Sequence, residues 1–175
     1  MTLPEPREIR AHDGTPYRLR PIRPGDAPSL IRVFDAMPAR SRWFRFLRPL
    51  PHLPPDMAAR WCSPDPRREV CLVVEGRDAL EGDILGGARV AELAAGGIAE
   101  FAVSMRPEAE GMGLARQATE AVIEVARARG AAGIRGCIAA ENSWMLGLAR
   151  RLDMTVTPDA EDHALRVARL DFASG

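Results

Sequence analysis

The sequence predicts an α/β protein in which a mixed, mostly antiparallel sheet carries helices on both faces. Two strand–turn–helix units, at residues 98–130 and 134–152, support this prediction, because each joins a short apolar strand to a helix with one apolar face. Alternating strands at 69–75 and 83–94 add an antiparallel pair. At 175 residues with 46% hydrophobic content, the chain is long enough for one core and short for two.

The predicted elements follow one another along the whole chain. We expect residues 1–13 to form a flexible segment, because they are polar and contain prolines, and residues 14–175 to form one domain. Gly76 and Gly82 bound a loop suited to an antiparallel hairpin. In chain order, the predicted strands lie at 16–22, 69–75, 83–94, 97–105, 134–140, 154–157 and 164–170, and the predicted helices at 24–37, 54–62, 113–129 and 142–152.

The segment at 40–48 interleaves arginines with aromatic residues, a pattern that also occurs in nucleic-acid and membrane-surface contacts. The formal net charge is +0, the segment is short and no second basic stripe accompanies it. We therefore expect neither nucleic acid nor a membrane as a partner. Instead, Trp43, Phe44 and Phe46 are expected to pack between the first helices while the arginines stay solvated.

A glycine-containing turn follows the strand at 97–105 and opens the helix at 113–129. Gly111 and Gly113 can adopt left-handed dihedrals, and their lack of Cβ atoms lets successive backbone N–H groups converge on a phosphate at the first turn of the helix. Arg116 can pair with Glu120 one turn later. The pattern predicts an anion site, although a purely structural turn uses the same glycines.

Several kinds of phosphate and metal chemistry are excluded by residues that the sequence lacks. All of its 24 Lys+Arg residues are arginine, so the lysine of a P-loop, a kinase or a pyridoxal enzyme is absent. Arg116 stands where a dinucleotide fingerprint needs a small residue. The 3 histidines are scattered without metal-ligand spacing, so we expect no metal site. Unpaired cysteines, a polar amino terminus and the lack of a membrane-spanning apolar run predict a cytoplasmic protein.

Two motifs in the second half of the chain resemble those of the GNAT superfamily of N-acyltransferases. Glu110-x-x-Gly113-x-Ala115 resembles the acyl-CoA pyrophosphate loop Q/R-x-x-G-x-G/A, with Glu110 in place of Gln or Arg. Residues 134–154 are similar to the second motif, in which Asn142 would hydrogen-bond the cofactor. Asn142 is also suited to capping the helix that follows it, and the two roles are compatible.

Two further stretches resemble a narrower group. Residues 19–26 (LRPIRPGD) and 41–46 (SRWFRF) are similar to L-R-P-I-R-P-x-D and S-R-Y-F-R-F in the catalytic domain of bacterial protein lysine acetyltransferases of the Pat type. Together the resemblances span roughly residues 17–155. They imply a GNAT fold with about seven strands and a splayed central strand pair, acetyl-CoA as cofactor, and a protein lysine as acceptor.

The resemblance also implies which residues bind acyl-CoA and which group acts as base. The cofactor-binding residues it implies are Val103, Met105, Glu110, Gly111, Met112, Gly113, Leu114, Ala115 and Asn142. An amine attacks a thioester only after it loses its proton, and Glu100 is the candidate general base because Ile98, Phe101 and Val103 would desolvate it and raise its pKa. The alternative is that Glu100 faces solvent or forms a structural salt bridge.

Departures from the family pattern leave two other functions open. Ala149 stands where many members have the tyrosine that protonates the departing thiolate, and Asp153-Met154 replaces the usual Gly-Phe. A thiol with a pKa near 8.5 still leaves tolerably well at neutral pH. One alternative is an enzyme for a small amine or an amino acid, which predicts a closed, acidic acceptor pocket. The other is a catalytically idle acyl-CoA-binding module.

Overall fold

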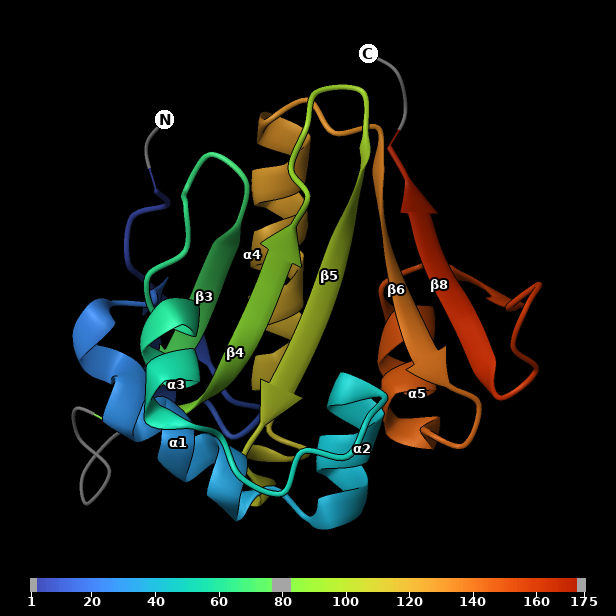
Figure 1. Cartoon of the computed structure of the whole chain (residues 1–175). Coiled ribbons are helices and arrows are strands. Elements are labelled where there is room, and N and C mark those ends of the chain that lie inside the picture. Colours follow the sequence, from blue (N-terminus) through green and yellow to red (C-terminus); the bar gives the residue numbers. More distant parts are fainter. Residues whose placement is uncertain (1–2, 77–82, 173–175) are drawn as a thin grey trace.

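In a computed structural model that describes residues 3–76 and 83–172, eight strands form one sheet in the order β1-β2-β3-β4-β5-β6-β8-β7 (Figure 1). The strands are β1 (Arg7–Arg10), β2 (Pro16–Pro21), β3 (Val70–Glu75), β4 (Ile84–Ala91), β5 (Ile98–Met105), β6 (Gly133–Ala139), β7 (Thr155–Pro158) and β8 (Leu165–Asp171). Every neighbouring pair is antiparallel except β5 and β6, which run parallel. The predicted mixed, mostly antiparallel sheet is therefore confirmed.

Helices cover both faces of this sheet. The helices are α1 (Ala27–Ala36), α2 (Ala39–Phe46), α3 (Pro55–Trp61), α4 (Leu114–Ala128) and α5 (Ser143–Arg151), with 3-10 turns η1 (Pro24–Asp26) and η3 (Pro107–Ala109) before α1 and α4. Helices α1, α2 and α3 lie in front of the sheet in Figure 1, and α4 runs behind β4 and β5. None of the helices in the described part of the chain is long and apolar enough to cross a membrane.

The central strands β5 and β6 separate soon after they meet. Their register pairs Ile98 with Gly133, Ala99 with Ile134 and Glu100 with Arg135, and no later pair is formed among the described residues. Gly136 follows the last paired residue of β6, Arg135. Only glycine fits at this position without a shift of its neighbours, because a Cβ there would lie 2.7 Å from the Phe101 ring. The ring packs against Gly136 on the core side of the sheet, next to the last paired residues, and the predicted splayed pair is confirmed.

The main core lies between the sheet and helices α4 and α5. Residues of α4 recur on one face at helical spacing, so Leu114, Ala118 and Val122 are all fully buried against the strands. A second group of apolar residues lies under α1 and α3 on the opposite face, where Phe34, Leu53 and Ala58 are buried. Both faces of β3, β4 and β5 are thus covered, which makes these strands the rigid centre of the fold.

Two buried ion-pair networks attach α1 to this sheet. Arg20 on β2 donates two hydrogen bonds to Asp26, at 2.8 and 2.9 Å. Asp83, just before β4, accepts hydrogen bonds from Ser29 and Arg32 on α1 and from Arg106 after β5. Burial opposes ionisation of Asp83, but the hydrogen bonds from Arg32 and Ser29 prevail and lower the pKa of Asp83 to about 2.

Some expectations from the sequence need correction. Residues 7–10 form β1 rather than part of a flexible segment, because β1 pairs with β2 and Gln117 on α4 bonds to both backbone groups of Arg10. This strand raises the count in the described residues from the expected seven to eight. Residues 39–46 form α2, a helix that the sequence did not predict. Of the predicted hairpin loop at 76–82, residues 77–82 lie outside the described residues.

Candidate active site

The separation of β5 and β6 opens a groove of about 380 Å³ in the middle of the sheet. Its walls come from β5, β6, α2 and the start of α5, and include Ala102, Ser104, Cys137 and Asn142. Helix α2 lies at the lower end of the gap in Figure 1, between the end of β5 and α5. It is attached at both sides, because Arg45 donates to Ser104 of β5 at 3.1 Å and Arg40 pairs with Glu141 beside α5 at 2.9 Å.

The gap exposes hydrogen-bonding backbone groups of β5. The Arg106 N–H donates to the Leu85 carbonyl at 2.7 Å, so at this register the even-numbered residues of β5 direct their N–H groups toward β4. The N–H groups of Val103 and Met105 consequently point the other way, toward the side that β6 has left. These two predicted cofactor-binding residues therefore present backbone donors to the groove.

The turn after β5 has the backbone conformation that the sequence predicts. Gly111 and Gly113 have φ of +73° and +80°, in the left-handed region that favours glycine. Gly113 is the N-cap of α4, and no side chain in the described part of the chain caps its first turn. The first-turn N–H groups are therefore free to bind a phosphate. Glu110 is exposed and lines the groove, and Leu114 and Ala115 are buried beneath the turn.

Asn142 serves as the helix cap that the sequence allowed. Its Oδ1 accepts a hydrogen bond from the Met145 N–H at 3.1 Å, while its side chain also lines the groove. The amide Nδ2 remains available as a donor. At the other end of α5, Asp153 adopts φ +57°, which is the conformation that a glycine would take there, and Met154 is buried. The turn is therefore kept despite the replacement of Gly-Phe.

Glu100 lies at the apex of the gap but not in an apolar environment. Strand alternation turns Phe101 and Val103 into the core behind the sheet, whereas Glu100 faces the front and its side chain is 47% exposed. It pairs with Arg135 of β6 at 3.0 Å. The expected desolvation by apolar neighbours is therefore wrong, and the alternative of a solvent-facing ion pair describes the geometry.

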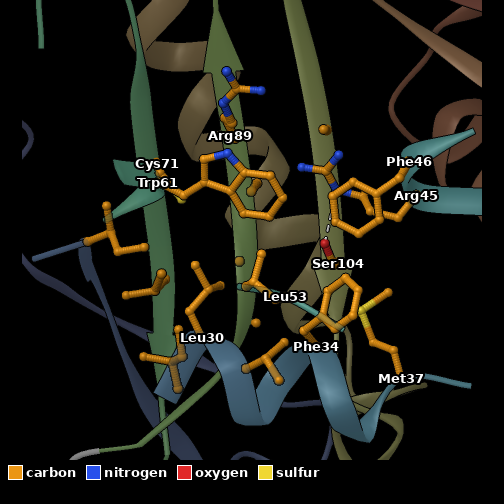
Figure 2. A pocket seen from close by; sticks show the side chains of 18 of the residues that line it. Leu30, Phe34, Met37, Arg45, Phe46, Leu53, Trp61, Cys71, Arg89 and Ser104 are labelled. Atoms are coloured by element: carbon orange, nitrogen blue, oxygen red, sulfur yellow. Dashed lines mark hydrogen bonds between the residues drawn. The ribbon is translucent and has the colours of Figure 1, made fainter. Parts of the chain in front are cut away.

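A separate apolar cavity of about 190 Å³ lies beside the groove, on the face covered by α1, α2 and α3. Figure 2 shows Leu30, Phe34, Leu53 and Trp61 around its interior and Arg45 and Arg89 at one end. Met37, Arg45, Ala102 and Ser104 line both the cavity and the groove, so the two spaces share a wall.

The charged end of the cavity contains two arginines and one carboxylate. Glu69 accepts hydrogen bonds from Arg89 at 2.5 and 2.9 Å. Burial, together with the nearby positive charge of Arg89, lowers the pKa of Arg45 to about 10. Burial likewise raises the pKa of the Cys71 thiol in the cavity wall to about 12, so that thiol is neutral.

Comparison with known proteins identifies this arrangement. A model of the acetyltransferase (GNAT) domain matches residues 17–155. The chain belongs to the GNAT family of acetyltransferases. Members of this family use acetyl-CoA, which is therefore the acetyl donor of this enzyme.

Solved structures share the GNAT fold. The chain is similar to the GNAT domain of PAT from S. lividans, with a TM-score of 0.84 and 22% identity over 95% of this chain and 97% of that one. A putative acetyltransferase from Salmonella typhimurium, solved with its cofactor acetyl-CoA, has a TM-score of 0.68 and 19% identity over 90% and 94%. A cAMP-binding acyltransferase from Mycobacterium smegmatis has a TM-score of 0.63 and 20% identity, over 97% of this chain and 48% of that one.

The GNAT site contains residues that sequence reasoning missed. Arg45 was expected to be solvated but instead forms a wall of the cavity, and Glu69, Trp61 and Arg89 were not singled out at all. The interleaved Arg and aromatic pattern at 40–48 gave a partial signal, since Phe46 does pack, stacked on Trp61 with ring centroids 5.5 Å apart. Trp43, in contrast, is 41% exposed, so its expected packing is wrong.

Proposed function

We propose that this enzyme transfers the acetyl group of acetyl-CoA to a lysine side chain of a protein. The observation that carries the proposal is the placement of Glu100 and the free Val103 N–H on one strand beside an open gap. The similarity to a PAT GNAT domain over 95% of the chain supports a protein acceptor. The neighbouring cavity argues against a small cationic amine, because its charged end carries Arg45 and Arg89 and is not acidic.

In this proposal the donor lies along β5 with its phosphates at the start of α4. The first-turn amides after Gly113 bind the pyrophosphate, and the left-handed turn through Glu110, Gly111 and Met112 places them. The Met105 N–H and the Asn142 Nδ2 bond the pantetheine arm. The groove of about 380 Å³ between β5 and β6 accommodates that arm.

The Val103 N–H polarises the thioester carbonyl and stabilises the oxyanion that forms when the amine attacks. Glu100 lies three residues earlier on the same strand, about 10 Å away along the backbone. A carboxylate at that distance takes the proton of the ammonium group through more than one bridging water rather than directly. The ion pair with Arg135 at 3.0 Å orients the Glu100 carboxylate for this role.

The leaving group departs without the tyrosine that many GNAT members use. Ala149 is fully buried in the core, so no side chain from this position reaches the groove. The CoA thiolate takes its proton from water, which is consistent with a thiol pKa near 8.5.

Radiolabelled acetyl-CoA, a bacterial lysate and purified enzyme test this function. Wild type is expected to label protein bands, and a lysate whose lysines have been dimethylated is expected to stay unlabelled. Glu100→Gln should lower kcat by about 10²- to 10⁴-fold, because general base catalysis is lost, without a change in the Kd for acetyl-CoA.

Glu124→Gln is the matched control, since Glu124 forms a similarly exposed ion pair with Arg7 at 2.8 Å, remote from the gap. Its kcat should equal that of wild type. Label confined to small molecules would reject the protein acceptor, and full activity of Glu100→Gln would reject the base.

A further inference from the structure

The cavity beside the groove combines an apolar interior with an unpaired positive charge. Arg89 pairs with Glu69, whereas Arg45 forms no ion pair within residues 3–76 and 83–172. Arg45 donates a hydrogen bond to the Ser104 hydroxyl at 3.1 Å and lies 4.9 Å from the Phe46 ring centroid, and the charge of Glu69 acts on it without direct pairing. Arg45 is half-buried, so its guanidinium loses part of its hydration, and no ion pair in the described residues replaces what it loses. A ligand that brings a carboxylate to Arg45 would offset this cost.

The position of Arg45 relative to the reacting carbon limits which ligand group can reach it. Ala102 and Ser104 flank Val103, whose N–H faces the gap, and both side chains line the cavity as well as the groove. In the proposed function, the thioester sulfur lies on the groove side with the rest of CoA. The amine approaches from the side of Glu100, a residue that does not line the cavity. The remaining substituent of the acyl carbon, its alkyl chain, is therefore directed into the cavity.

We propose that the cavity binds the acyl chain of a short dicarboxylic acyl-CoA, of the succinyl class, with the distal carboxylate on Arg45. This inference rests on the proposed function in placing CoA in the groove and the amine on the Glu100 side. The two methylenes of a succinyl group would pass between Met37 and Ala102, and the guanidinium can bind both carboxylate oxygens. Acetyl-CoA uses the same site without filling the cavity.

Transfer of such a group follows the same chemistry as acetyl transfer. The amine nitrogen forms an amide bond with the acyl carbon, and the carbon–sulfur bond breaks. The ammonium proton leaves through Glu100 to water, and the CoA thiolate takes a proton from water. No oxidant, reductant or further co-reactant is required.

Titration calorimetry with succinyl-CoA and butyryl-CoA tests the site without any acceptor, so the result does not depend on whether the acceptor is a protein lysine. The two ligands have the same chain length and differ by a carboxylate in place of a methyl group. Wild type should bind succinyl-CoA about tenfold more tightly than butyryl-CoA, since a hydrogen-bonded ion pair between a carboxylate and a half-buried arginine is among the stronger polar interactions. Arg45→Gln should reverse this preference.

Two further variants test whether the preference depends on the guanidinium of Arg45 itself. Arg45→Lys keeps the charge but not the planar fork, so it should retain an intermediate preference. Arg48→Gln removes an exposed arginine just beyond the same helix and should bind as wild type does. Thermal unfolding shows whether each variant is folded. Equal affinity of wild type for the two ligands, or a preference that Arg45→Gln leaves unchanged, would overturn the proposal.

A second experiment tests whether the carboxylate that binds Arg45 belongs to the acceptor instead of the acyl chain. Leucine and leucinamide are compared as acceptors with acetyl-CoA, in wild type and in Arg45→Gln. The ratio of their rates should be the same in wild type and in Arg45→Gln if Arg45 binds the acyl chain. An Arg45-dependent preference for leucine, without any preference among the acyl-CoA ligands, would overturn the acyl assignment and would also reject the protein lysine as acceptor.

Discussion

Replacing Gly136 by alanine tests how the gap between β5 and β6 is set. The added Cβ would lie 2.7 Å from the Phe101 ring, which is only 6% exposed. Overpacking of this kind costs about 2 kcal/mol. For a chain of this size the corresponding fall in Tm is about 4–8 °C. Because Gly136 also lines the groove, acetyl-CoA should bind more weakly.

The same chemical change at Gly147 is the matched control. Gly147 lies inside α5, where a Cβ would meet only the Arg151 guanidinium at 3.7 Å, an ordinary contact. Gly147→Ala should therefore raise Tm by about 2 °C through its helix propensity. Urea unfolding of Gly136→Ala, Phe101→Leu and the double variant should show that removing the ring recovers most of the cost of the alanine. A cost that persists in the double variant would refute contact with Phe101 as the cause.

Three further predictions concern the cap, the buried carboxylate and the groove thiol. Asn142→Ala should lower the free energy of unfolding by about 1 kcal/mol, whereas Asn142→Ser keeps the helix cap and should be nearly as stable as wild type. If the Asn142 amide contacts acetyl-CoA, calorimetry should find weaker acetyl-CoA binding in both variants. Asp83→Asn should lower the free energy of unfolding by about 2 kcal/mol at pH 7, because the pKa of Asp83 is depressed to about 2 in the folded state. Urea unfolding should show the difference between wild type and variant vanish as the pH falls from about 4 toward 2. Cys137 is exposed in the groove, and partial burial of its thiol raises its pKa, so its alkylation should accelerate only above the usual thiol pKa. Bound CoA should block this alkylation, while buried Cys62 should stay unreactive. Labelling of Cys137 that CoA leaves unaffected would contradict its place in the groove.

Local patterns predicted most helices and strands because the signals that specify them are short-range. The apolar spacing of α4, the glycines at 111 and 113 and the cap at Asn142 each depend on residues within one or two turns. Helix α2 was missed because it has no side-chain cap, exposes much of its surface and buries no residue completely. It is held by tertiary contacts, because Phe46 packs on Phe34 and Trp61 and Arg45 donates a hydrogen bond to Ser104 of β5, which lies far away in the sequence.

By itself, the sequence determined the order of the elements, the left-handed turn that frees the first amides of α4, and the family to which these motifs belong. Only the tertiary structure decided the environment of the side chains between those elements. It paired Glu100 with Arg135 instead of burying it, and it placed Arg45 beside Ser104 at the shared wall of the groove and the cavity. The physical reason is that backbone conformation follows from neighbours in sequence, whereas charge, burial and cavity shape follow from which strands and helices meet.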